Sequence, residues 1–369
     1  MLSPLAPLGY NNADERQLRR DLMQAAQSYL QANKDHRFAD KRMLGKSFLL
    51  IALCGICYFS ALLSSHTFAI MFSYAAFMCL ALLLAINIVH DASHNAIFRQ
   101  EWANRWLNLL VTIPLGLDPD CWRVRHIILH HAHTNIQHYD LDIEENGVLR
   151  QTPFQRWHPI MRWQHYYWPV VAAFTFPSLI WFYDWADRSG FTQAQRRMRY
   201  QGIAGWSLFL LGKSLHLLVT LAIPYFLLAP KGISFVTLFT LYLLSQLLAS
   251  FIFVMLILGT HWGRATYYQA PANGIMPHGF YTHTFNTTYD WYFLNDAISY
   301  WLGGLNLHLT HHLFPNWNHR HYPALSRLIA EVAKKHAAVD YQCVPLKQLF
   351  SDQQRFLKAM GKNPNKKST

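Results

Sequence analysis

Four long apolar runs are the feature that most constrains this chain. They lie at 47–64, 68–89, 203–228 and 233–259, and each approaches the roughly 20 residues that a helix needs to cross a bilayer. Inside a membrane, only helices and closed barrels satisfy every backbone hydrogen bond. The runs therefore predict an all-α integral membrane protein whose four transmembrane helices form two hairpins.

The distribution of basic residues predicts how these spans are oriented. Eight Lys or Arg residues lie between Arg16 and Lys46, and "RRMRY" at 196–200 precedes the third run. The short connections within the two hairpins carry only Lys231. Because basic residues tend to remain on the cytoplasmic side, we expect both hairpin tips outside and both termini inside. We expect the membrane to be the bacterial inner (cytoplasmic) membrane.

Two shorter apolar stretches lie outside these spans. They occupy 106–117 and 169–183, contain proline and are too short to cross the bilayer. We expect both to lie at the membrane interface as amphipathic or re-entrant pieces. A full crossing by only one of them would place the histidines around 126–131 and those around 308–312 on opposite sides.

The composition favours a lipid partner over nucleic acid. Hydrophobic residues make up 52% of the chain and charged residues only 14%, compared with roughly 25% charged residues in soluble proteins. In a soluble protein, the net charge of +12 would suggest nucleic acid, but no nucleic-acid-binding motif accompanies it. In a membrane protein the same charge reflects inside-positive loops and anionic headgroups. We therefore expect a lipid bilayer as partner and no nucleic acid.

Histidines gather where the apolar runs are expected to reach the cytoplasm. The segment "GGLNLHLTHHLFP", for example, places His308, His311 and His312 on one face of a helix. With four spans, nine of the 21 histidines can lie at one membrane depth on one side. These nine are His90, His94, His126, His130, His131, His261, His308, His311 and His312.

Nine imidazoles exceed the capacity of one metal ion and fit two. A catalytic zinc takes about three protein ligands, whereas iron suits O2 chemistry at a nitrogen-rich site. A site just beneath four apolar spans can receive an alkyl chain from the lipid. The imidazoles bring no negative charge, so carboxylates behind them would orient the rings and raise their basicity. The candidates are Asp91, Asp140 and Asp142.

The three histidine segments resemble the histidine boxes of the integral-membrane fatty acid desaturases. "HDASH" at 90–94 is similar to the first box, and "HIILHH" at 126–131, with an acidic stretch behind it, to the second. The segment at 308–312, followed by "NHRHYPAL", is similar to the third box of the front-end and acyl-lipid branch. That branch usually has Gln at the place of His308. His261 resembles an additional ligand that lies outside the boxes.

The resemblance implies a non-haem di-iron enzyme in which four membrane helices cap a cytosolic helical part. Such an enzyme uses O2 and two external electrons to introduce a C=C bond into an acyl chain. The similarity extends over about 47–335, which leaves a basic cytosolic arm at 1–46 and a cytosolic tail at 336–369. No "HPGG" haem signature occurs, so we expect a separate ferredoxin, rubredoxin, flavoprotein or cytochrome as electron donor.

The sequence departs from the family pattern near His261. Some relatives have an Asn one turn earlier that holds a water on one iron, but Ile257 stands there, and Asn306 is a candidate replacement. The stretch "HTFNTTYDW" resembles a family segment whose threonines could contact substrate, and two tryptophans lie beside ligands. The candidate channel residues are therefore Trp122, Trp262, Thr287 and Thr288.

The spacing of the boxes leaves the reaction and the substrate open. Hydroxylases, ketolases, acetylenases and alkane monooxygenases use the same metal site, although the context "GGLN…HHLFP…HYPAL" favours acyl desaturation. A metal transporter would place its histidines along a path in mid-span, whereas these lie at span ends. The acyl group can be carried by a lipid, by coenzyme A or by an acyl carrier protein, and neither chain length nor double-bond position can be read from the sequence.

Overall fold

The computed structural model describes residues 5–364, and most of them are helical. Four helical segments are long and apolar enough to cross a membrane: Lys41–Leu63, Thr67–Ser93, Gly202–Lys231 and Phe235–His261. The predicted all-α membrane fold with four spans is confirmed. Most of the spans extend past the apolar runs, because the helices continue into the polar residues that follow or precede them.

The described chain falls into two units. Unit 1 comprises Phe38–Val124 and Ala172–Val254, and unit 2 comprises 5–37, Arg125–Val171 and 255–364. Nearly all of the four spans belong to unit 1. Most of the histidines singled out above belong to unit 2.

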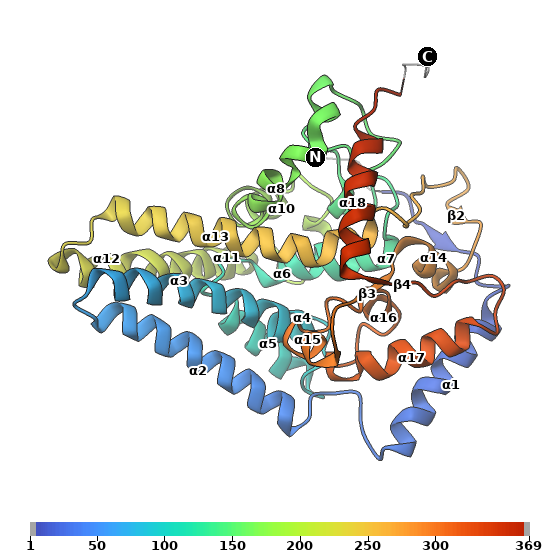
Figure 1. Cartoon of the computed structure of the whole chain (residues 1–369), viewed down its shortest axis with the longest axis horizontal. Coiled ribbons are helices and arrows are strands. Elements are labelled where there is room, and N and C mark those ends of the chain that lie inside the picture. Colours follow the sequence, from blue (N-terminus) through green and yellow to red (C-terminus); the bar gives the residue numbers. More distant parts are fainter. Residues whose placement is uncertain (1–4, 365–369) are drawn as a thin grey trace. The chain divides into compact units, whose positions relative to one another are not determined.

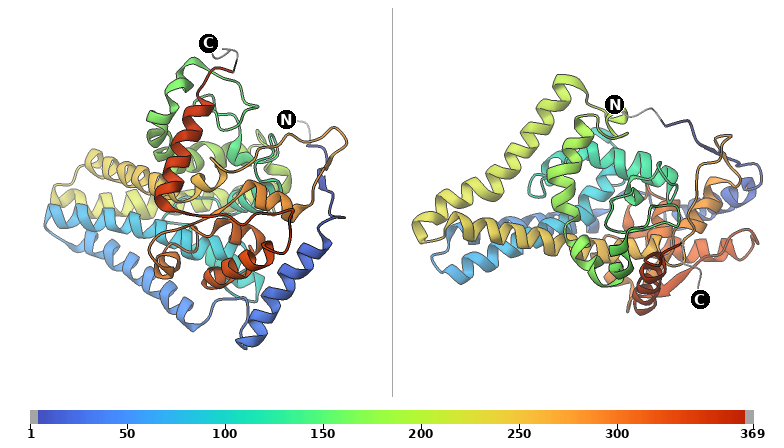
Figure 2. Two further views of the ribbon diagram at one scale, coloured as in Figure 1. Left: turned by 45° about the vertical axis from the view of Figure 1, so that its right-hand side comes forward. Right: turned by 90° about the horizontal axis from the view of Figure 1, so that it is seen from above.

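The first hairpin of unit 1 pairs α2 (Lys41–Leu63) with α3 (Thr67–Leu84). The carboxylate of Asp40 accepts a hydrogen bond from the amide of Met43 at 2.8 Å and so caps α2. The short loop between the helices brings them side by side, as Figures 1 and 2 show. A π-helical segment, Ala85–Val89, carries the span on into α4 (His90–Ser93).

The second hairpin consists of α11 (Gly202–Leu217), α12 (Ile223–Leu228) and α13 (Phe235–Ile257). A π-helical segment, Leu218–Ala222, joins α11 to α12. Such a segment widens the hydrogen-bond spacing and can free carbonyl groups for other partners. The Tyr74 hydroxyl of the first hairpin uses one of them, donating to the carbonyl of Thr220 at 2.6 Å.

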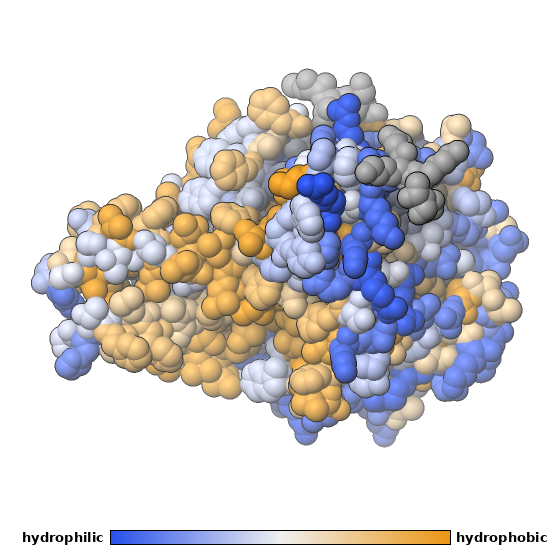
Figure 3. Space-filling model, turned by 45° about the horizontal axis from the view of Figure 1, so that its top comes forward, coloured by the Kyte–Doolittle hydropathy of each residue, from blue (hydrophilic) through white to orange (hydrophobic). Residues whose placement is uncertain are grey.

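Apolar side chains cover the outside of the spans. Phe48, Leu63, Phe68, Ile203 and Phe226 are each between 74% and 87% exposed. Figure 3 shows hydrophobic residues over the long helices. Hydrocarbon is the natural solvent for such a surface, since large contiguous apolar patches are rare on soluble proteins.

Of the two stretches expected at the interface, the first is helical only in its first half, and the second is helical except at residue 174. The first overlaps α5 (Glu101–Val111), an amphipathic helix that exposes Trp102 and Trp106, and tryptophans favour the membrane–water boundary. The second is divided between α8 (Gln164–Ala173) and α9 (Thr175–Ser178) and a π-helical segment after them. Neither stretch is among the four candidate spans of the described chain.

Buried charges tie the polar loops of unit 1 to α11. The Lys213 ammonium donates at 2.7 Å to the carbonyls of Gly116 and Ile180 and to the carboxylate of Asp184. Asp184 belongs to α10 (Asp184–Arg188), and the Arg188 guanidinium donates to Asp118 at 3.1 Å. All three ammonium protons of Lys213 therefore have acceptors, which gives this intramembrane lysine a structural role.

Replacing Lys213 with Met would leave the Asp184 carboxylate buried without its cation. Removing one partner of a buried pair typically costs about 3–5 kcal/mol. We therefore expect Lys213→Met to lower the midpoint of thermal unfolding in detergent. Arg327→Met is the control, because its pair with Asp296 is 67% exposed on both sides and such pairs contribute little. Equal midpoints for the two variants would contradict this role.

Candidate metal centre

The third histidine box of unit 2 lies on a short helix whose start is held by a buried carboxylate. This helix, α16, runs from His308 to Leu313 and lies beside β3 (Asp290–Tyr292) (Figure 1). The Asp290 carboxylate accepts hydrogen bonds from the Thr310 amide at 3.1 Å and the Thr310 hydroxyl at 2.6 Å. The strand thus fixes the helix that presents three of the predicted ligands.

Four histidines of unit 2 converge on one point. They are His130, His261, His308 and His312, all buried, and one ring nitrogen of each lies within 4.8 Å of those of the others. The Nε2 atoms of His261 and His308 are 2.9 Å apart. His261 comes from the turn after α13, and His130 from the end of a π-helical segment, Val124–His130. Three distant parts of the sequence therefore supply one group of nitrogen donors.

The outer nitrogens of three of these four rings have polar neighbours behind them. The Nδ1 atom of His130 lies 3.0 Å from the Asp140 carboxylate, and that of His261 lies 3.1 Å from the Thr287 carbonyl. The Nδ1 atom of His312 is 3.4 Å from the Thr134 hydroxyl. Such contacts select the tautomer that leaves Nε2 free to ligate a metal.

The donor set fits a transition metal. The Nε2 atom of His312 is buried and has no hydrogen-bond partner within residues 5–364, which is costly unless something else occupies that direction. Four imidazoles without a carboxylate among them suit iron, copper or zinc rather than magnesium or calcium. The group therefore has the composition and the burial of a metal site.

Carboxylates behind the group set its charge. Burial lowers the pKa of His130, but Asp140 and Asp142 outweigh this effect and raise it to about 9. Burial raises the pKa of Asp140, but His130 and nearby backbone amides outweigh it, so the net shift is downward. For His312, burial followed by repulsion from the neighbouring imidazoles lowers the pKa well below its usual value. His312 is thus held neutral, as a ligand must be, whereas His130 would have to release a proton on binding a metal.

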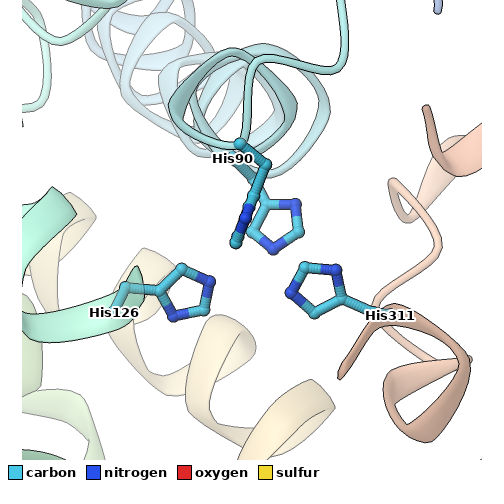
Figure 4. A group of neighbouring side chains, drawn as sticks. His90, His126 and His311 are labelled. Carbon is cyan, nitrogen blue, oxygen red and sulfur yellow. The ribbon is translucent and has the colours of Figure 1, made fainter. Parts of the chain in front are cut away.

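Three further histidines of unit 2 form a second group, which consists of His126, His131 and His311. The Nε2 atom of His131 lies 2.9 Å from that of His311 and 3.3 Å from that of His126. Figure 4 shows the rings of His126 and His311 directed toward each other across a small space, with ring centroids 5.8 Å apart. Two histidines of the second box thus lie beside one histidine of the third.

A glycine pair and a tyrosine support this second group. Gly304 has φ of 72°, and a Cβ there would come within 2.5 Å of the Tyr322 ring, so only glycine fits. The Tyr322 hydroxyl, brought close in this way, lies 2.9 Å from Nδ1 of His311. The "GG" and "HYPAL" segments that flank the third box therefore act on the same ligand.

His90 and His94 of the first box belong to unit 1, and His90 is also labelled in Figure 4. Both are buried, and their ring centroids are 5.2 Å apart. The Nδ1 atom of His90 lies 3.4 Å from the Asp91 carboxylate. Within unit 1, the i, i+4 pair and its predicted carboxylate are therefore in contact.

The remaining predicted residues have varied surroundings. Asp142 lies 3.5 Å from Nδ1 of His130 but is 46% exposed. The Thr288 hydroxyl lies 3.4 Å from Nδ1 of His261, and Trp262 is fully buried against Phe356. The Asn306 amide donates to the carbonyl of Trp291 at 3.0 Å. Roles in a substrate channel for Trp122, Trp262, Thr287 and Thr288, and an iron-linked role for Asn306, stay predictions.

Sequence reasoning missed Asp290, Thr134 and Tyr322 as supports of the site. Asp290 and Tyr322 lie inside segments whose resemblance to the family was noted, "HTFNTTYDW" and "HYPAL". That context was the only available signal, because the contacts of these residues are tertiary. Asp290 contacts Thr310, Thr134 contacts His312, and Tyr322 contacts His311.

Comparison with known proteins agrees with this site. The model of the fatty acid desaturase family matches residues 64–343, a segment that includes all three histidine boxes. The chain belongs to the fatty acid desaturase family. The family predicted from the boxes is thereby confirmed.

Among curated relatives, this desaturase-family chain resembles proteins named as acyl-lipid desaturases. It is 29% identical over 301 residues to the sn-1 linoleoyl-lipid 6-desaturase of Synechocystis sp., covering 77% of this chain and 79% of the relative. It is 28% identical over 263 residues to the protein of the same name from Arthrospira platensis, with 68% and 67% covered. The acyl-lipid (8-3)-desaturase of Physcomitrium patens is 24% identical over 337 residues, with 89% and 68% covered.

Replacing Asp140 with Asn would remove the charge behind His130. Loss of such a partner typically weakens metal binding by about 10- to 100-fold. We expect the purified Asp140→Asn protein to retain much less iron than the wild type, measured by atomic emission. The matched control is Asp142→Asn, since that carboxylate is farther from His130 and half exposed. Full iron retention in Asp140→Asn would show that this carboxylate does not support a ligand.

Proposed function

We propose that this protein is an O2-dependent fatty acyl desaturase that holds two non-haem iron ions and introduces a C=C bond into an acyl chain. The observation that carries the proposal is the group of His130, His261, His308 and His312, four buried imidazoles whose nitrogens face one another. Bound iron would supply the oxidation, in which O2 takes two hydrogens from the chain and, with two external electrons and two protons, is reduced to two molecules of water.

The nine histidines divide into proposed ligand groups. His130, His261, His308 and His312 would hold one iron, and His126, His131 and His311 would contribute to the other. His90 and His94 are assigned on the sequence resemblance alone. Each of the nine is less than 10% exposed. Bulk water would therefore be kept from the ligands, which limits side reactions with solvent.

Residues behind the ligands would keep the geometry constant during turnover. Asp140 holds His130, the Thr287 carbonyl holds His261 and Tyr322 holds His311. A ring that cannot rotate presents the same nitrogen in every cycle. The position of the acyl chain relative to these fixed ligands would then select the C–H bond that reacts.

The surroundings of the reaction are proposed from the relatives and the charge pattern. The relatives named above act on acyl lipids, so we propose a lipid-linked acyl chain as substrate, ahead of coenzyme A or acyl carrier protein. Electrons would come from a separate ferredoxin, rubredoxin, flavoprotein or cytochrome. The active site and both termini would face the cytoplasm at the bacterial inner membrane.

Replacing His311 with Ala should abolish the reaction. A host expressing the wild type should form a new alkene that is absent with His311→Ala, measured by GC–MS after derivatisation of the double bond. His66→Ala is the control, because His66 is an exposed histidine in the turn before α3. A hydroxy acid in place of the alkene would reassign the protein to the hydroxylases, and an active His311→Ala would remove this residue from the ligands.

His308 tests whether the unusual histidine of the third box is needed. Its Nε2 atom lies 2.9 Å from that of His261, and a Gln amide oxygen is a weaker ligand for iron than a neutral imidazole. We expect His308→Gln to lose most of the alkene product and about half of the bound iron. A fully active His308→Gln would show that this position tolerates the residue usual in the front-end branch.

A further inference from the structure

Unit 1 contains a hollow that the proposed metal site does not use. It holds about 940 Å³ of space free of protein atoms, part of which is open to solvent. Its lining includes apolar residues, among them Leu109, Ile113 and Phe209. It also includes arginines and other polar residues, so the hollow suits a ligand with one apolar and one charged part.

The hollow adjoins the first histidine box. Ser93 and Asn95, the residues on either side of His94, both line it. Its lining also includes one face of α5, where Arg105 and Asn108 follow Glu101 at helical spacing. A molecule bound there would therefore extend from the amphipathic helix α5 to a residue next to a proposed iron ligand.

The charges that line the hollow leave one cation without a counterion. Four of the five lining cations form ion pairs with acidic side chains at 2.6–3.1 Å. The pairs are Arg199–Glu101, Arg123–Asp120, Arg188–Asp118 and Lys213–Asp184. The fifth is Arg105, which is half-buried and has neither an ion pair nor a side-chain hydrogen bond to any residue of the described chain. A half-buried guanidinium in that position favours an anion.

We propose that this hollow binds the phosphodiester headgroup of a phospholipid, with Arg105 as the residue that contacts the phosphate. A phosphodiester carries one negative charge, which matches the single unpaired cation. Coenzyme A carries several, and a glycolipid headgroup such as galactose carries none. The inference deepens the proposed function, because it identifies the acyl carrier as an anionic phospholipid whose acyl chain would begin beside His94.

The position of α5 supports a lipid over a soluble carrier. Trp102 and Trp106 on this helix are 60% and 61% exposed, as expected of aromatic anchors at the membrane boundary. Arg105 lies between them in the sequence, and long cationic side chains at this depth reach toward headgroups. The apolar lining residues of the hollow would contact the glycerol and the first methylene groups.

Binding to the purified, iron-loaded protein tests this proposal without an electron donor. Phosphatidylglycerol is titrated into micelles of a neutral detergent, and the retained lipid is counted by native mass spectrometry. We expect one tightly held phosphatidylglycerol, a loss of affinity of about tenfold or more in Arg105→Gln because a charge-assisted contact disappears, and partial recovery in Arg105→Lys. Arg197→Gln is the matched control, since it removes an exposed arginine that does not line the hollow and should bind as the wild type does.

Other outcomes would overturn the proposal. Equal phosphatidylglycerol affinity in the wild type and Arg105→Gln would remove Arg105 from the contact, and equal affinity for a galactolipid would remove the need for a phosphate. If Arg105→Gln weakened the binding of stearoyl-coenzyme A but not that of phosphatidylglycerol, the result would indicate a soluble carrier. Iron content and the unfolding midpoint are measured for each variant to detect misfolding.

The failure of this inference can be told apart from that of the proposed function. Phosphatidylglycerol binding that depends on Arg105, in a protein that forms no alkene in cells, would support the headgroup site and contradict the desaturase proposal. Alkene formation together with binding that is insensitive to Arg105 would contradict the headgroup site alone.

Discussion

Four of the buried imidazoles that face one another in unit 2 have a polar group at their outer nitrogen, and the placement of these groups organises much of the unit. Without Asp140, the Thr287 carbonyl or the Tyr322 hydroxyl, the rings could rotate or exchange tautomers, and the inward nitrogens would not stay aligned. These supports come from a loop, from the end of a short helix and from α17 (Tyr322–Ala333). Loops and short elements of unit 2 therefore place polar groups next to the Nδ1 atoms of these histidines.

In unit 1, buried polar groups are stabilised by contacts with one another among the apolar side chains of the spans. Lys213 reaches three acceptors at once, and His216 lies 2.8 Å from the Tyr242 hydroxyl. These contacts hold the loop after α5 against α11 and so shape one wall of the arginine-lined hollow. An intramembrane charge is often a sign of transport, but here it builds the scaffold.

The four spans and the three boxes were predictable because their signals are local. A run of about 20 apolar residues can be read without knowing any contact, and histidines three and four positions apart must share a helical face. The helices within the interfacial stretches could not be delimited in this way. Their proline residues and short apolar lengths gave no helix boundaries, and the bounds of α5, α8 and α9 came from the structure.

The sequence by itself determined the fold class, the family and which histidines are proposed as ligands, since each depends on residue types at fixed spacing. Only the tertiary structure decided how seven of those histidines divide into two groups and which residues stand behind four of the rings. It also decided that Arg105 alone among the cations of its hollow lacks an acidic partner within the described chain. Such facts depend on distances between segments far apart in the sequence, and pairwise distances of this kind leave no periodic pattern in a single chain.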